Sequence, residues 1–406
     1  MKLIEITNKE LIKEFLEFPV RLYKDDPNYI RPLDKDVESV FDLEQNKLFK
    51  RGGKAIRWIL KNGTGKTIGR VAAYINPMTV NKDESLPTGS MGFFDCINDQ
   101  QAANMLFDTC KNWLMEQGVE AMDGPVNLGD RDKWWGCLAE GYTEPNYCMH
   151  YNFPYYNDLY QNYGFGVFFK QYTYHRLVPD TLDEKLINKG EVIYNNPDYH
   201  FEHMKISNLM KYAKDFSVIY TKAWTKHEGV KGIDEKQAAK IFKTMKPILD
   251  EEIAWFGYYK DEPVAFYLQI PEMNQIIRNI KDGKFGVWNK LKMFYHVKRK
   301  TSRKLFGLVF GVVPEHQRKG VEAGIILAYS NFIQEKLKKQ GKASDDPAFV
   351  HKGYHYNELE MNWIGDFNPK MMRTAELIGG KIFKTHITYR KLFDETREFK
   401  RMTIID

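Results

Sequence analysis

The chain of 406 residues carries the same succession of apolar patterns twice. Alternating apolar residues predict strands, and apolar residues three or four positions apart predict helices. In the first half the predicted strands are 3–6, 56–61, 69–75, 90–96 and 168–177, and the predicted helices begin at Asn8 or cover 100–117 and 155–163. In the second half the predicted helices are 201–225, 234–249, 321–340 and 369–377, and the predicted strands are 253–259, 264–270, 304–313, 358–364 and 381–392.

This repeated order predicts an α/β protein with a mixed sheet, built from two similar units at 1–180 and 181–406. No Pro-, Gly- or Ser-rich linker separates the units, so they are expected to pack closely. A basic insertion at 278–304 interrupts the second unit, with ten Lys or Arg residues against one acid, Asp282. Such charge can attract an acidic acceptor, RNA or a membrane surface, or can belong to a solvated helix face.

Composition and net charge limit the classes of protein to which the chain can belong. Hydrophobic residues make up 43% of the chain and charged residues 28%, as in folded proteins in water. A net charge of +6 is too small for a dedicated nucleic-acid binder, so no DNA partner is expected. The absence of a signal-peptide pattern and of any run near 18 apolar residues predicts a cytoplasmic protein with no membrane span. The cysteines form no CxxC pair and are expected to be reduced thiols: Cys96, Cys110, Cys137 and Cys148.

Residues 311–324 leave a predicted strand and open a predicted helix. Unpaired backbone N–H groups at a helix start favour a phosphate, and Gly320 lets a ligand approach the main chain. Arg318 and Lys319 add positive charge. The pattern indicates a phosphate site, with a plain strand-to-helix turn bearing solvated basic residues as the alternative.

The run Val313-Pro314-Glu315-His316-Gln317-Arg318-Lys319-Gly320 resembles the acyl-CoA-binding motif of the GCN5-related N-acetyltransferase (GNAT) superfamily, Gln/Arg-x-x-Gly-x-Gly/Ala. The resemblance implies acetyl-CoA or another acyl-CoA as cofactor, with its pantetheine on the strand end and its pyrophosphate on the turn. It assigns to the cofactor Val312, Val313, Gln317, Arg318, Lys319, Gly320, Val321 and Ala323. Glu322 departs from the motif, because the family has Gly or Ala there. Either Glu322 points outward, or a shift of one residue lets Ala323 and Gly324 serve.

The segment from Glu360 to Gly380 is similar to the fifth strand and fourth helix of that family. The resemblance implies that Asn368 contacts the cofactor arm, although a plain helix N-cap explains this residue equally well. Many members carry a tyrosine that protonates the departing thiolate, and Ala375 stands at that position here.

The first half resembles the same helix motif, with Tyr160 and Gly164-Phe165 retained. Its strand exit has no glycine and no basic residue, and Asp95 and Asp99 would repel a pyrophosphate. The chain therefore resembles a tandem GNAT protein with a degenerate N-terminal copy and a C-terminal copy that binds the cofactor.

In the family an amine attacks the thioester within a ternary complex, which requires a general base. Alternation along the strand places Glu358 and Glu360 on one face, and either is a candidate base if that face lines the cleft. Solvent-facing carboxylates are the alternative. Candidates for the missing acid are Tyr354, Tyr356 and Tyr389.

The function that these features predict is CoA-dependent N-acyl transfer, with acetyl-CoA as donor and a small-molecule or peptide amine as acceptor. Two alternatives stay open. One is a non-catalytic module that binds an anionic partner at 278–304, and the other is an enzyme like the aminoacyl-tRNA-dependent peptidyltransferases, which share the tandem architecture. No metal is expected, because His351 and His355 have no third ligand nearby.

Overall fold

The computed structural model describes residues 1–81, 86–129, 131, 133–224, 232–339 and 355–405. Its strands are β1 (Lys2–Glu5), β2 (Lys54–Lys61), β3 (Thr67–Ile75), β4 (Thr88–Cys96), β5 (Ala121–Gly124), β6 (Cys137–Glu140), β7 (Gly166–Leu177), β8 (Tyr199–His203), β9 (Ala254–Tyr259), β10 (Glu262–Pro271), β11 (Lys304–Val312), β12 (Glu358–Gly365) and β13 (Lys381–Leu392). Its helices are α1 (Lys9–Leu22), α2 (Asp34–Phe41), α3 (Gln100–Glu116), α4 (Tyr155–Asn162), α5 (Glu184–Tyr194), α6 (Leu209–Trp224), α7 (Glu235–Met245), α8 (Asn274–Ile277), α9 (Val287–Lys298), α10 (Val321–Lys339) and α11 (Pro369–Leu377).

The strands form one mixed 13-stranded sheet in the order β1-β2-β3-β4-β5-β13-β7-β12-β11-β10-β9-β8, with β6 paired to β13. Most neighbours are antiparallel, whereas β4 with β5 and β11 with β12 are parallel. A mixed α/β architecture is thus confirmed. Local capping agrees with the sequence: Asn8 accepts a hydrogen bond from the Leu11 amide at the start of α1, and Asp99 caps α3.

Helices cover both faces of the sheet. On β10, Phe266 packs against Phe216 of α6, whereas the next residue, Tyr267, packs against Tyr329 of α10. Successive strand residues point to opposite faces, so α6 and α10 lie on opposite sides of the sheet. In the first half, α1 and α3 both pack on β3.

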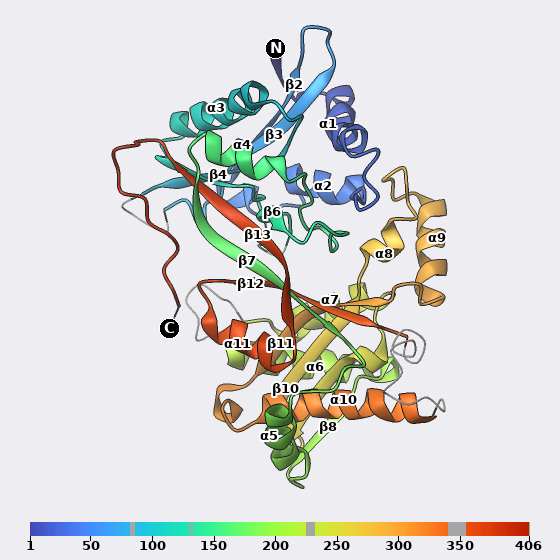
Figure 1. Ribbon diagram of the computed structural model, residues 1–406. Helices are drawn as coiled ribbons and strands as arrows, with labels where there is room; N and C mark the ends of the chain where they lie inside the picture. The colour runs from blue at the N-terminus through green and yellow to red at the C-terminus, as the bar shows by residue number, and fades with distance from the viewer. Residues whose placement is uncertain (82–85, 130, 132, 225–231, 340–354, 406) are drawn as a thin grey trace.

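The two halves share their long strands. β7 ends the first half but pairs with β12 of the second half, while β13 ends the second half and pairs with β5 of the first. Figure 1 shows both strands running from one half into the other. The division at residue 180 stays a prediction about the order of elements, since the sheet itself is continuous.

The helix predicted at 201–225 is wrong at its start. Residues Tyr199–His203 form strand β8, whose alternating side chains pair with β9, and the helix begins at Leu209. Helices α2 and α5 were not predicted. The buried positions of α5 are Leu186, Gly190 and Ile193, and a glycine in this stripe weakens the apolar signal.

The four cysteines are free and buried, as expected of thiols that form no disulfide. None of the helices in the described ranges has the length and apolar character needed to cross a bilayer.

Candidate functional site

Strands β11 and β12 separate part-way along their length. They pair in parallel from Lys304 and Glu358 to Gly307 and Met361, and the pairing ends there. Beyond this point β12 pairs only with β7 on its other side, and β11 carries a bulge opposite Leu268. Within the described residues, the β11 edge that faces β12 therefore offers backbone groups without a strand partner.

A cavity of about 140 Å³ lies in this opening. Its walls come from β10, β11, β12 and α11, and its lining surface is mostly apolar. The lining residues are Tyr267, Leu268, Gly307, Leu308, Val309, Phe310, Met361, Asn362, Trp363, Ile364, Met371, Thr374, Ala375 and Ile378. An apolar slot edged by free peptide groups can hold a linear amide-containing chain such as pantetheine.

The turn between β11 and α10 has the conformation that its glycine permits. Gly320 has φ +94° and Arg318 has φ +64°. The side chains of Gln317, Arg318 and Lys319 are exposed, and Gln317 donates a hydrogen bond from Nε2 to the Val312 carbonyl at 2.9 Å. His316 anchors the turn, because its Nδ1 lies 2.7 Å from the Tyr199 hydroxyl. The turn thus presents two cations to solvent beside the start of α10, whose first residues are themselves buried or half-buried.

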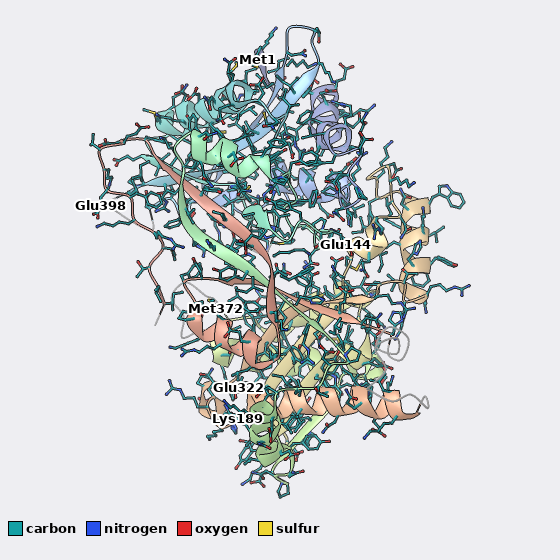
Figure 2. All side chains as sticks on the ribbon, viewed as in Figure 1. Met1, Glu144, Lys189, Glu322, Met372 and Glu398 are labelled. Carbon is teal, nitrogen blue, oxygen red and sulfur yellow. The ribbon has the colours of Figure 1, made fainter. Side chains whose placement is uncertain are left out.

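Helix α5 packs on the other side of this turn, where Figure 2 labels Lys189 and Glu322. A Cβ added to Gly320 would lie 3.3 Å from the Lys189 carbonyl oxygen, and one added to Gly324 would lie 2.8 Å from the ring of Phe201. The space beside Gly324 is therefore filled by packing within the protein. This disfavours the alternative in which the motif shifts by one residue and Ala323 and Gly324 contact the cofactor. Glu322 is half-buried, and its Oε2 has no partner among the described residues.

The other residues predicted to contact the cofactor lie in the core or at a helix cap. Val312, Val313, Val321 and Ala323 are buried in the core of the second half, and the Val313 amide donates to the Val264 carbonyl. Asn368 caps α11, accepting from the Met371 amide at 3.2 Å. Residues 307–310 of β11 line the cavity and come before Val312 and Val313 in the chain, where the motif predicts the cofactor contacts. No sequence signal marks residues 307–310, because their exposure in the cavity depends on where β11 and β12 separate.

Glu360 is enclosed in an ion cluster at the junction of the halves. Its carboxylate lies 2.6 Å from Lys304 Nζ and 2.9 Å from Lys384 Nζ, and it accepts from Asn146 Nδ2 at 2.8 Å. Burial alone would raise the pKa of Glu360, but the two lysines lower it to about 2. Glu360 is fully buried, so the solvent-facing alternative is wrong for this residue. A carboxylate with this pKa is a weak proton acceptor at neutral pH.

A second residue, Asn146, connects Glu360 to the cavity wall by hydrogen bonds. Asn146 donates to Glu360 and also to Asn362 Oδ1 at 2.7 Å, and Asn362 lines the cavity. Nearby, burial raises the pKa of Glu272 to about 7, although its carboxylate accepts from the Tyr147 amide. Asn362 is thus a polar group of the cavity wall that no sequence motif marks.

The remaining candidates lie apart from the cavity wall. Glu358 is half-exposed beside His175, whose hydrogen bond lowers the pKa of this carboxyl. Tyr389 is buried in the first half, where it stacks on Tyr160 and donates to Asn157 Oδ1 at 2.9 Å. Tyr356 donates to Asp250 Oδ2 at 2.8 Å. Burial raises the pKa of both tyrosines. Tyr354 lies outside the described residues.

The corresponding opening in the first half is filled. Strands β4 and β5 pair in parallel only as far as Ser90 and Asp123. Beyond that point a Cβ at Gly92 would lie 1.7 Å from the Val126 carbonyl oxygen, so the main chain itself occupies the space. Asp95 is buried against Arg70 at 2.7 Å. Among the described residues no group of three His, Cys, Asp or Glu side chains could hold a metal ion.

Comparisons with known proteins identify the fold. No protein-family model matches the chain. A protein named bacterial ceramide synthase, from Caulobacter vibrioides, is 24% identical over 393 residues, which cover 96% of this chain and 97% of that protein. A tandem GNAT protein from the clavulanic acid biosynthesis pathway superimposes with a TM-score of 0.50 at 9% identity, covering 97% of this chain and 98% of its own. A GCN5-related glucosamine N-acetyltransferase region of a fungal multi-domain β-N-acetylglucosaminidase gives 0.51 at 11% identity, covering 96% of this chain and 38% of that longer one.

The chain has a tandem GNAT fold. The predicted architecture of two GNAT-like copies is therefore confirmed. By the sequence motif, β11 and β12 are the fourth and fifth strands of the second copy. The cavity and the exposed turn both adjoin β11, the strand on which the sequence motif predicts an acyl-CoA, and that assignment stays a prediction.

Proposed function

We propose that this protein is an acyl-CoA-dependent N-acyltransferase whose thioester binds between β11 and β12. The cavity in that opening carries the proposal, because it adjoins unpaired strand peptides and leads along β11 to an exposed cationic turn. Arg318 and Lys319 would pair with the pyrophosphate of the acyl-CoA. The unpaired peptide groups of β11 would hydrogen-bond its pantetheine. The acyl-CoA supplies an activated carbonyl carbon. The amine forms a C–N bond there, the C–S bond breaks, and CoA leaves as the thiol.

We assign the carbonyl contact to Asn362. Its Oδ1 accepts from Asn146, which leaves the Nδ2 group as a donor for a carbonyl oxygen in the cavity. A fixed donor of this kind stabilises the negative charge that develops on the carbonyl oxygen during attack. Glu360 then acts as a positioning residue that holds Asn146, and of the predicted bases Glu358 keeps the more accessible carboxylate.

The donor and the acceptor are proposed by class. Acetyl-CoA fits the family resemblance. The relative named bacterial ceramide synthase covers nearly the whole chain, and ceramide is an amide, so long-chain acyl-CoA and long-chain amines belong in the same test. Calorimetry with CoA, acetyl-CoA and palmitoyl-CoA measures donor binding, and thiol release with short and long amines measures turnover. Absence of heat at millimolar CoA would refute the proposal.

A second candidate is a module that binds the donor or an anionic partner without turnover. Ala375 lines the cavity where many family members carry a tyrosine, and the Glu360 carboxylate is held by two lysines. Saturable CoA binding without thiol release on any amine would favour this candidate. Thiol release that depends on the amine would exclude it.

A further inference from the structure

Helix α9 exposes an apolar side to solvent. Its exposed side chains and their exposed fractions are Val287 at 72%, Trp288 at 83%, Leu291 at 55%, Phe294 at 51% and Tyr295 at 54%. At 100° per residue these five positions fall on one side of the helix. A contiguous patch of large apolar side chains on a water-soluble surface indicates an interaction site.

The opposite side of α9 is fixed to the protein. Met293 and Val297 pack against a cluster that includes Ile276 and Ile277 of α8. Lys292 Nζ also donates to the Asn279 carbonyl at 2.6 Å. Figure 1 shows α9 at the side of the molecule, beyond α8. The helix is therefore held with its exposed apolar side directed outward.

Cations surround this patch, and those other than Lys292, whose Nζ donates to the Asn279 carbonyl, are available to an outside partner. Within the described ranges no ion pair is made by Lys290, Lys292, Lys298 or Arg299. Other cations of the insertion are paired inside the protein: Lys300 with Asp250, Arg278 with Glu144, and Lys304 with Glu360. Part of the net +9 of residues 278–304 is thus neutralised internally, and the charge beside the apolar patch is not.

We propose that α9 docks this protein on an anionic lipid bilayer, with the helix lying in the plane of the interface. An apolar strip flanked by lysine and arginine fits such a surface. The apolar side chains can insert among the acyl chains, while the cations pair with the anionic headgroups. Trp288 and Tyr295 are of the types enriched at membrane interfaces. RNA would use the cations and aromatic rings but gains nothing from exposed Val287 and Leu291. The attachment is peripheral and does not depend on the proposed transferase function.

Vesicle flotation of the full chain tests the proposal. We expect binding to vesicles of phosphatidylcholine with phosphatidylglycerol and much weaker binding to phosphatidylcholine alone. The triple variant Trp288→Ser/Leu291→Ser/Phe294→Ser should lower partitioning at least about tenfold, since each lost side chain removes buried apolar area. The matched control Leu43→Ser/Val192→Ser removes exposed apolar groups elsewhere and should bind as the wild type.

A charge variant separates electrostatic attraction from insertion. Lys290→Glu/Lys298→Glu should weaken binding to anionic vesicles by about fivefold or more per position and reduce its dependence on salt. Brominated lipids should quench wild-type tryptophan fluorescence more than that of Trp288→Phe. The proposal is overturned if the wild type ignores anionic vesicles, if both variants bind normally, or if polyuridylate binds through α9 while vesicles do not.

Discussion

Glu360 and Lys384 lie on strands separated by β7, yet their carboxylate and ammonium groups meet at 2.9 Å. Both side chains are buried, and Lys304 completes the cluster from β11. The cluster joins three strands of the second half, and Asn146 of the first half donates to it, at the closed end of the β11–β12 opening. It fixes the geometry of the opening beside which Asn362 lies.

The substitution Glu360→Gln should destabilise the protein by about 3–5 kcal/mol, because it leaves the buried Lys384 without a counter-ion and Lys304 with only Glu144, at 3.5 Å. The check is the free energy of unfolding in urea. Glu358→Gln, at a half-exposed carboxylate, should change it by much less. Full stability of Glu360→Gln together with lost turnover would instead return Glu360 to the role of general base.

Filling the cavity should block the donor. Leu308→Trp places a large ring at the cavity wall, and we expect the affinity for acetyl-CoA to fall at least about tenfold by calorimetry. Leu377→Trp is the matched control, because Leu377 is exposed on α11 and does not line the cavity. Equal affinity of both variants would place the donor elsewhere.

The exposed cations of the turn should contribute to pyrophosphate binding. Arg318→Ala and Lys319→Ala should each weaken CoA binding about five- to tenfold and reduce its salt dependence. Lys240→Ala and Lys243→Ala, exposed on α7, are the controls. Gly320→Leu is a poor probe, because its positive φ and its contact with α5 would cost about 1–2 kcal/mol or more in folding.

Asn362→Ala should lower kcat by about 100-fold with little change in KM, as expected for a donor that acts in the transition state. Asn146→Ala should lower kcat less, since Asn146 acts through Asn362. Steady-state kinetics with the preferred amine provide the measurement. A rise in KM alone for Asn362→Ala would contradict the assignment.

Glu272 should make stability depend on pH. Burial raises its folded pKa to about 7 from an ordinary 4.5, so the folded chain holds a proton that the unfolded chain releases. Its contribution is full below pH 4.5 and is lost as the pH rises through about 7. Glu272→Gln should flatten this slope in urea titrations, whereas Glu262→Gln, at an exposed position, should keep it.

Local conformation and the fold were predictable from the sequence, and long-range placement was not. The turn Gln317–Gly320 could be recognised because its motif is contiguous, and the fold because the order of elements repeats; the part of the turn in cofactor binding stays a prediction. The burial of Glu360 could not be read from alternation, since its lysines arrive from other strands. Tyr389 was a candidate acid near the second-half site, but strand exchange places it in the first-half core. The residues that line the cavity could not be predicted either, because they depend on where β11 and β12 separate.

The position of β13 affects how the protein is made. This strand is synthesised after every other strand of the sheet, yet it inserts between β5 and β7. Until residues 381–392 leave the ribosome, β5 keeps an open edge that can pair with other chains. We therefore expect the first half to mature only after translation has passed β13, and chains arrested before that strand to need chaperones.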